Sequence, residues 1–332
     1  MSRLANTTVR LRAAARRASR SVYGWVALAG LLLGLGLAVF TALWPPLPPL
    51  EGPPVALWRS DLGQVEAIPL ELYVAGVVAA EMPVTFHPEA LKAQAVAART
   101  LAVRSLVQPR ATDGTALTDQ ASRDQAWSSQ EALRRRWGWW RYPFAWRKIA
   151  EAVLATEGEI LTYQGEPIFA AYHSTSGGQT EASENVWREA LPYLVSLYDP
   201  YGARGPYAQT ERFIDRAQLA GRLGPLEWRG EEPPLFVLSR YPSGRVERVQ
   251  YGSRIYTGRQ IREALGLPST WFEVIWEGNG ARFLLRGYGH GVGMSQYGAD
   301  GLARAGRTYR EILAHYYPGT VLTTWPGDGG GR

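Results

Sequence analysis

The stretch that decides the fold is residues 68–107, IPLELYVAGVVAAEMPVTFHPEALKAQAVAARTLAVRSLV. Its first half carries apolar side chains at helical spacing, namely Leu70, Val74, Val77 and Val78. This spacing predicts a helix over 68–83, which ends there because Pro83 disfavours helical geometry in the residue before it. Pro88 begins a second helix over 87–107. The connection between the two helices is short, which predicts that they form a helical hairpin.

The second helix is rich in alanine, with small side chains at Ala90, Ala93, Ala95, Ala97, Ala98 and Ala102. We expect a thin helix that other backbone approaches closely. Around this hairpin we predict a strand region at 55–68, β-hairpins at 158–178, 234–252 and 271–287, and helices at 148–157, 258–267 and 309–316. Hairpins dominate, so the predicted class is α+β with a mostly antiparallel sheet.

The N-terminus has the pattern of a membrane anchor. Residues 25–44, WVALAGLLLGLGLAVFTALW, contain no charge and are long enough to cross a bilayer as a helix. Residues 1–24 contain six arginines and no acid, which places this basic tail in the cytoplasm and the rest of the chain outside. A cleaved signal peptide is the alternative, although its apolar core is usually shorter.

Two further boundaries follow from composition. The proline-rich residues 45–54 are typical of a stiff extended linker. We predict one domain over 55–325, with no internal boundary, and a flexible tail over 326–332.

Charge and cysteine content exclude several functions. The net charge is +6, and the six arginines of the N-terminal tail account for all of it, so the body offers no basic face for nucleic acid. The chain has no cysteine, which excludes disulfides, thiolate metal sites and a cysteine nucleophile.

Glu81 is the carboxylate with the strongest signal for chemistry. It falls on the apolar stripe of the first helix, where desolvation raises a carboxyl pKa. It also lies at the C-terminal end, where the helix dipole disfavours an anion. Both effects favour a protonated group, as a general acid requires. The alternative is a satisfied structural acid between two helices. Glu89, in the first turn of the next helix, is interpreted as structural.

The loop at 286–299, RGYGHGVGMSQYGA, surrounds His290 with glycines. It lacks the spacing of a phosphate-binding motif. We interpret the glycines as permitting an unusual backbone path or the close approach of a ligand. Residues 172–187, YHSTSGGQTEASENVW, have a similar character. A structural role for either histidine is the alternative, and two histidines without metal-ligand spacing do not predict a metal site.

A segment at 134–147 combines arginine with tryptophan, RRRWGWWRYPFAWR. Stacking on sugar rings and contact with a membrane surface are two interpretations. A solvated helix with an aromatic face is the third.

Three stretches together resemble the SpoIID/LytB family: residues 77–103, residues 172–194 and residues 287–320, in the family's order and spacing. The resemblance covers about 55–325. It implies a peptidoglycan lytic transglycosylase that acts on glycan strands lacking stem peptides, beside a cell-wall amidase and other membrane-bound engulfment proteins. Other members are described as amidase enhancers, so a non-catalytic glycan-binding protein is the alternative.

The resemblance also assigns residues. The family's catalytic glutamate corresponds to Glu81. We expect substrate contacts from Gln94, Arg99, Tyr172, His173, Ser176, His290, Ser295, Gln296 and Tyr297. No cofactor is expected. Some relatives hold a metal near the middle stretch with a cysteine ligand, and because this chain has no cysteine we predict no metal there.

Overall fold

The computed structural model describes residues 25, 29–34, 46–108, 117–187, 189–225 and 233–325. The chain divides into two compact units, Met1–Pro49 and Leu50–Arg332. In the first unit, Trp25 and residues 29–34 are helical and exposed. Most of the predicted span at 25–44, the basic tail at 1–24 and the tail at 326–332 lie outside the described residues. Within the described ranges, no helix has both the length and the apolar character needed to cross a bilayer.

The second unit contains all the named elements. The first are β1 (Pro54–Arg59), β2 (Gln64–Pro69), α2 (Leu70–Glu81), α3 (Pro88–Val107), β3 (Leu117–Thr118), α4 (Gln130–Trp137), α5 (Tyr142–Leu154), β4 (Glu159–Tyr163), β5 (Glu166–Pro167), β6 (Tyr172–His173) and the 3-10 helix η1 (Ser183–Asn185). The remainder are β7 (Thr210–Asp215), α6 (Arg216–Leu223), β8 (Leu235–Arg240), β9 (Val246–Tyr251), β10 (Arg254–Thr257), α7 (Gly258–Leu265), β11 (Phe272–Glu277), β12 (Gly280–Leu285), β13 (Met294–Ser295), α8 (Gln296–Arg304), α9 (Tyr309–Tyr316) and β14 (Val321–Thr324).

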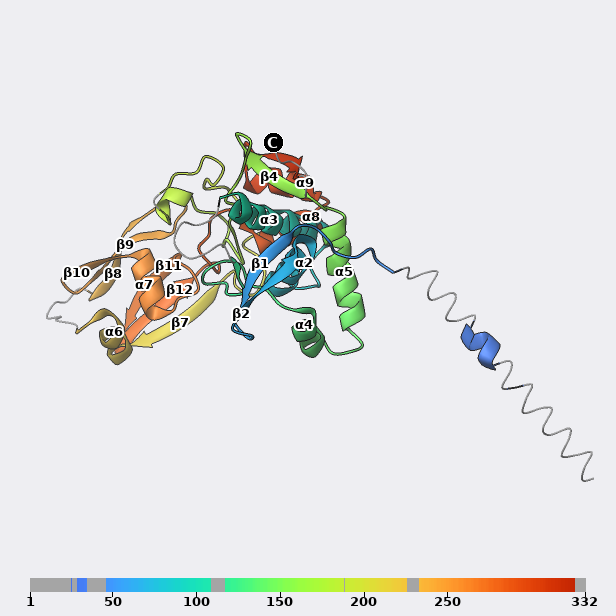
Figure 1. Ribbon diagram of the computed structural model, residues 1–332. Helices are drawn as coiled ribbons and strands as arrows, with labels where there is room; N and C mark the ends of the chain where they lie inside the picture. The colour runs from blue at the N-terminus through green and yellow to red at the C-terminus, as the bar shows by residue number, and fades with distance from the viewer. Residues whose placement is uncertain are drawn as a thin grey trace, which may run out of the picture. The chain divides into compact units, whose positions relative to one another are not determined.

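Helix α3 lies at the centre of the larger hydrophobic cluster, where α2, α5, α8 and β4 pack against it (Figure 1). All six alanines of the predicted thin helix are fully buried. The first two helices have the bounds that proline dictates. Met82 is extended ahead of Pro83, and Pro88 stands at the start of α3, where the side chain of His87 accepts a hydrogen bond from the Glu89 N–H at 3.3 Å.

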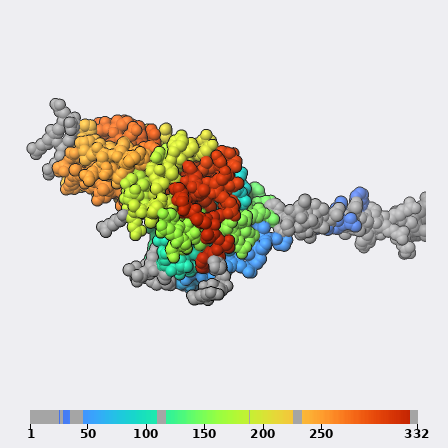
Figure 2. All heavy atoms as spheres, turned by 90° about the horizontal axis from the view of Figure 1, so that it is seen from above, coloured from blue at the N-terminus to red at the C-terminus, as the bar shows by residue number. Residues whose placement is uncertain are grey.

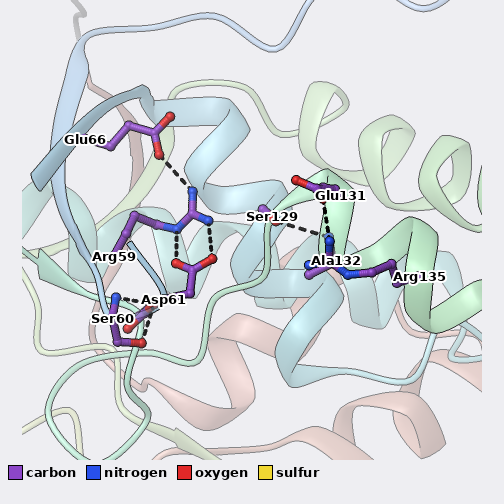
Figure 3. Close-up of polar contacts among 9 residues, drawn as sticks. Arg59, Ser60, Asp61, Glu66, Ser129, Glu131, Ala132 and Arg135 are labelled. Carbon is purple, nitrogen blue, oxygen red and sulfur yellow. Dashed lines mark hydrogen bonds and ion pairs between the residues drawn. The ribbon is translucent and has the colours of Figure 1, made fainter. Parts of the chain in front are cut away.

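The β1–β2 hairpin precedes α2 and is fastened by one arginine. Arg59 donates to Asp61 at 2.8 and 3.0 Å and to Glu66 at 2.8 Å, which ties the end of β1 to β2 (Figure 3). The guanidinium also lies over the ring of Trp127, 4.9 Å from its centroid. These contacts hold the segment around Trp127 close to the start of the fold.

A second hydrophobic cluster is built from residues 214–285. Its sheets have the strand orders β11-β12-β7 and β10-β9-β8, all antiparallel. Figure 2 shows its orange residues as a lobe at one side of the body. The predicted hairpins at 234–252 and 271–287 are confirmed, and Gly266 closes α7 in the left-handed conformation. The α+β class with mostly antiparallel pairing is therefore confirmed.

Two predicted elements differ in their bounds, and β7 and α6 have no counterpart in the prediction. The helix expected at 148–157 begins earlier, at Tyr142, where Pro143 lies in its first turn. The hairpin expected over 158–178 ends at Pro167, after a turn at Gln164-Gly165 in which both residues have positive φ. Beyond it, β6 pairs in parallel with β13, Tyr172 opposite Met294 and His173 opposite Ser295. This non-local pairing joins the middle stretch to the glycine-histidine loop.

Candidate active site

Glu81 ends α2 and is held by neutral hydrogen-bond donors. Its Oε1 accepts the backbone N–H of Ala126 at 2.9 Å, and its Oε2 accepts Nε2 of Gln296 at 3.5 Å. Among the residues that the structure describes, none forms an ion pair with this carboxylate. Burial raises the pKa of Glu81, and the hydrogen bonds from Ala126 and Gln296, together with the nearby Tyr172 hydroxyl, only partly oppose that rise. Partial burial therefore shifts this carboxyl group towards its protonated form.

Three predicted substrate-binding residues lie around Glu81, each from a different part of the chain. Gln296 begins α8, and its Nε2 also lies 3.4 Å from Oε1 of Gln94 on α3. Tyr172 on β6 donates to Oε1 of Gln125 at 2.8 Å. Burial raises the pKa of the Tyr172 phenol well above its ordinary value, and the nearby Glu81 carboxylate adds to that rise. Strand β13 leads directly into α8. Its pairing with β6 therefore brings both Tyr172 and Gln296 to the face of α3 that carries Gln94.

The two histidines form a separate pair. Their rings lie 5.7 Å apart, and the ring of Trp187 lies 5.2 Å from that of His290. Both histidines bond through Nδ1 to the backbone of Val292, His173 to its carbonyl and His290 to its N–H, each at 3.1 Å. Burial lowers the pKa of His173 well below the usual range and that of His290 to about 4. Both rings are neutral at neutral pH.

The predicted serines join loops within the protein. Ser176 donates to Asp199 at 2.7 Å, and Ser295 caps α8 by accepting the N–H of Gly298 at 3.1 Å. Both serines are fully buried. Tyr297 is half-buried and packs its ring edgewise on Phe86, with the centroids 4.9 Å apart. The serines thus hold the loops together, while Tyr297 retains some exposure.

Arg99 lies apart from Glu81 and faces the other end of α2. It is fully buried and binds both carboxylate oxygens of Glu71, at 2.8 and 2.6 Å. Its remaining donors reach the carbonyl oxygens of Val153 and Glu159. The Arg99 guanidinium is therefore surrounded by protein atoms, and it is not exposed on a surface where a ligand could contact it.

Comparison with known sequences agrees with this arrangement. The family profile described as "Stage II sporulation protein" (SpoIID) matches residues 59–163. Over 280 residues the chain is 41% identical to stage II sporulation protein D of Bacillus subtilis (strain 168), covering 82% of this chain and 80% of that protein. The chain belongs to the SpoIID family. The protein of the same name from Bacillus amyloliquefaciens is also 41% identical, over 83% of this chain and 81% of its own length.

A more distant relative has a different name. The amidase enhancer of Bacillus subtilis (strain 168) is 30% identical over 303 residues, which cover 75% of this chain and 40% of that protein. The family therefore includes proteins named for sporulation and for an effect on an amidase.

The glycines of the histidine loop serve packing in this SpoIID family member. Gly287, Gly289, Gly291 and Gly293 all have positive φ, which disfavours any side chain. A Cβ atom at these positions would meet Thr175 and Ser176, His173, the Arg245 guanidinium and the carbonyl of Ala171, in that order. The glycines thus allow the loop to lie directly on the middle stretch and on a buried arginine, so that the protein's own atoms occupy the space beside them.

Sequence reasoning missed the segment that holds Glu81 from outside its helix. Ala126 supplies the N–H to Glu81, and Gln125 links Tyr172 to Tyr73, whose hydroxyl accepts its amide at 3.2 Å. The signal was Gly76, inside α2: the Trp127 ring fills the space that a side chain there would need. In the described part of the chain, no group of three or more His, Asp or Glu side chains is arranged to hold a metal ion.

Proposed function

We propose that this SpoIID family member is a membrane-anchored peptidoglycan lytic transglycosylase. Its catalytic domain spans residues 55–325 and acts outside the cytoplasm, with residues 25–44 as a single-pass anchor and 45–54 as a linker. The substrate class is glycan strand lacking stem peptides. A cell-wall amidase that removes those peptides is the natural partner, together with membrane-bound proteins of engulfment. The observation that carries the proposal is the half-buried Glu81 carboxyl group at the end of α2, which accepts hydrogen bonds from the Ala126 N–H and the Gln296 amide and forms no ion pair with the described residues.

The reaction needs one carboxyl group. Protonated Glu81 gives its proton to the oxygen that links N-acetylmuramic acid to N-acetylglucosamine, and the bond from that oxygen to the anomeric carbon breaks. The C6 hydroxyl of the muramic acid attacks the same carbon, and its proton passes to the Glu81 carboxylate. The products are a 1,6-anhydro end and a free 4-hydroxyl, and the carboxyl group is restored. The substrate supplies the nucleophile, so the second carboxylate of an ordinary glycosidase is not required.

The neighbours of Glu81 have roles in this proposal. Gln94, Tyr172 and Gln296 are amide and phenol groups at hydrogen-bond distance from one another or from groups around the carboxyl. Gln94 is fully buried and Gln296 is 5% exposed, so these amides position the carboxyl group of Glu81, while the more exposed Tyr172 contacts the sugar. None of the three adds a charge that would shift the pKa of Glu81. His290 and Tyr297, partly exposed, are proposed to contact the strand farther along.

The test uses the full chain in detergent, incubated with glycan strands stripped of stem peptides. Mass spectrometry should find 1,6-anhydro products with the native chain and at least about a hundred-fold less with Glu81→Gln. Intact peptidoglycan should yield far less product. If the native chain releases no anhydro product from stripped glycan, the enzyme assignment fails.

The second candidate is a non-catalytic glycan-binding protein that enhances an amidase, and the name of the 30% identical relative favours it. Under this function, the native chain and Glu81→Gln would raise the rate of a purified cell-wall amidase equally. The two functions are separated by adding the amidase to each protein and measuring released stem peptide and anhydro ends in the same sample.

A further inference from the structure

The α4–α5 hairpin has two sets of aromatic side chains. The inner set is packed: the Tyr142 ring lies 6.3 Å from Trp137 and 6.1 Å from Trp146, nearly parallel to the latter. The Arg134 guanidinium covers Tyr142 at 4.9 Å. These contacts join the two helices and account for the aromatic residues that face the core.

The outer set stands at the turn between the helices, which we call the apex and define as Gly138–Arg141. Trp139 is 86% exposed and Trp140 is 61% exposed. Figure 1 shows this turn at the lower edge of the body, on the side away from β8–β12. Since the inner set already holds α4 to α5, the exposed rings of the apex are not needed to close this part of the core.

An apolar groove begins at the apex. Its volume is about 310 Å³, and its lining residues are Val84, Trp137, Trp140, Arg141, Phe144, Ala145 and Lys148. Among the described residues of this lining, the cations are Arg141 and Lys148, and the Lys148 ammonium already donates to the Phe86 carbonyl at 2.6 Å. A sugar ring needs polar partners around its edge, and this lining offers few. The groove therefore suits hydrocarbon better than a glycan.

The surroundings of the apex are strongly basic. Residues 130–148 contain five arginines and one lysine against a single acid, Glu131. That acid pairs with Arg135 one turn along α4, beside the Ser129 cap (Figure 3). Arg136 and Arg141 are exposed. Tryptophan among arginines is the combination that enters the headgroup region of a bilayer, because the ring prefers the interface and the cation attracts anionic lipid.

We propose that the apex docks on the outer surface of the membrane, inserting Trp139 and Trp140 among anionic headgroups. The proposal rests on the anchor proposed above: five residues, 45–49, separate its end from the body, which begins at Leu50, and five residues span at most about 18 Å. A domain held so near the bilayer meets its surface at high effective concentration, so a weak contact suffices. Docking fixes the height and orientation of the catalytic domain above the membrane.

The experiment exploits the absence of cysteine from the chain. Trp140→Cys, labelled with an environment-sensitive fluorophore, is reconstituted as the full chain in vesicles with and without phosphatidylglycerol. We expect a blue-shifted emission that brominated lipid quenches, only in the anionic vesicles. Phe213→Cys, 48% exposed on β7, is the matched control and should show neither effect. Equal emission and equal quenching at the two positions would overturn the proposal.

Two further measurements separate the contribution of charge at the apex from that of the anchor. Arg136→Gln with Arg141→Gln, or 1 M salt, should remove most of the quenching, since salt at that concentration screens charges beyond about 3 Å. Extraction of the vesicles with carbonate tests the anchor alone, because an anchored chain stays in the pellet whether or not the apex docks. A spectral change caused by soluble stripped glycan in place of lipid would assign the apex to sugar and refute docking.

Discussion

The two ends of α2 carry two glutamates with opposite surroundings, Glu71 buried and Glu81 half-buried. Glu71, in the first turn, is only 3% exposed and is bound on both oxygens by the fully buried Arg99. Glu81, in the last turn, receives a backbone N–H and a glutamine amide, and burial raises its pKa. Both side chains are removed from water on folding, Glu71 almost completely and Glu81 in part. At the first, a guanidinium stabilises the anion, and at the second, the protein leaves the anion without a cation.

The comparison shows how one helix separates structure from chemistry. A charge pair in which all three guanidinium nitrogens donate to the protein is firmly held and offers no transferable proton. A carboxyl group that meets only neutral donors keeps its proton nearer neutral pH and can transfer it. The helix dipole acts in the same sense, because it favours an anion at the first turn and disfavours one at the last.

The largest expected effect is the loss of turnover when Glu81, in the last turn of α2, is replaced. Glu81→Gln keeps the size of the side chain and removes the transferable proton, so release of anhydro ends should fall about a hundred- to ten-thousand-fold. Mass-spectrometric counting of anhydro ends over time measures this. The matched control is Glu89→Gln. Glu89 accepts hydrogen bonds from Lys92 and the Tyr309 N–H in a structural role, and its loss should leave turnover near native. Equal losses in both variants would contradict the comparison.

Disrupting the Glu71–Arg99 pair, at the first turn of α2, should lower stability. Arg99→Met leaves the Glu71 carboxylate buried without its cation, and removing one partner of a buried pair costs about 3–5 kcal/mol. Urea unfolding followed by circular dichroism measures the loss. Arg99→Met combined with Glu71→Gln should recover much of it, because no uncompensated charge then remains. Had Arg99 instead contacted substrate, the single variant would fold normally and show a raised KM.

The position of Glu81 at the end of its helix was predictable from the sequence, whereas the pairing of Glu71 with Arg99 was not. Glu81 is readable because its position depends on local rules, the apolar stripe of α2 and the stop at Pro83. Arg99 belongs to a pair with Glu71, 28 residues away, and nothing in the local pattern marks an arginine among alanines as buried. The same limit explains the missed Ala126 contact and the parallel β6–β13 pairing, which join segments 45 and more than 100 residues apart. Most of the predicted helices and hairpins were found near their expected bounds, whereas contacts between distant segments were not predictable.

The pH dependence of stability sharpens the contrast. The folded pKa of Glu81 is raised above its ordinary value of 4.5, so the folded state holds this proton more tightly than the unfolded state. Stability relative to Glu81→Gln should therefore be highest below pH 4.5, fall as the pH rises toward the folded pKa, and then stay constant. A folded pKa one pH unit above the unfolded pKa corresponds to a fall of about 1.4 kcal/mol in the free energy of unfolding. Urea midpoints of both proteins from pH 4 to 8 measure the difference, and a difference independent of pH would show that burial leaves the pKa of this group unchanged.

The smallest expected effect concerns Tyr172, which changes the pKa of Glu81 without supplying the proton that is transferred. Its hydroxyl lowers the pKa of Glu81 against the larger rise from burial, so Tyr172→Phe should raise that pKa further. A hydrogen bond contributes about 1 kcal/mol, which corresponds to less than one pH unit. The alkaline limb of the turnover profile, where the acid loses its proton, should move to higher pH by that amount. A purely structural role for Tyr172 would lower stability and leave the limb in place. Because the limb reports the protonation of Glu81 and not the amount of folded enzyme, its movement separates these two roles even if the variant is less stable.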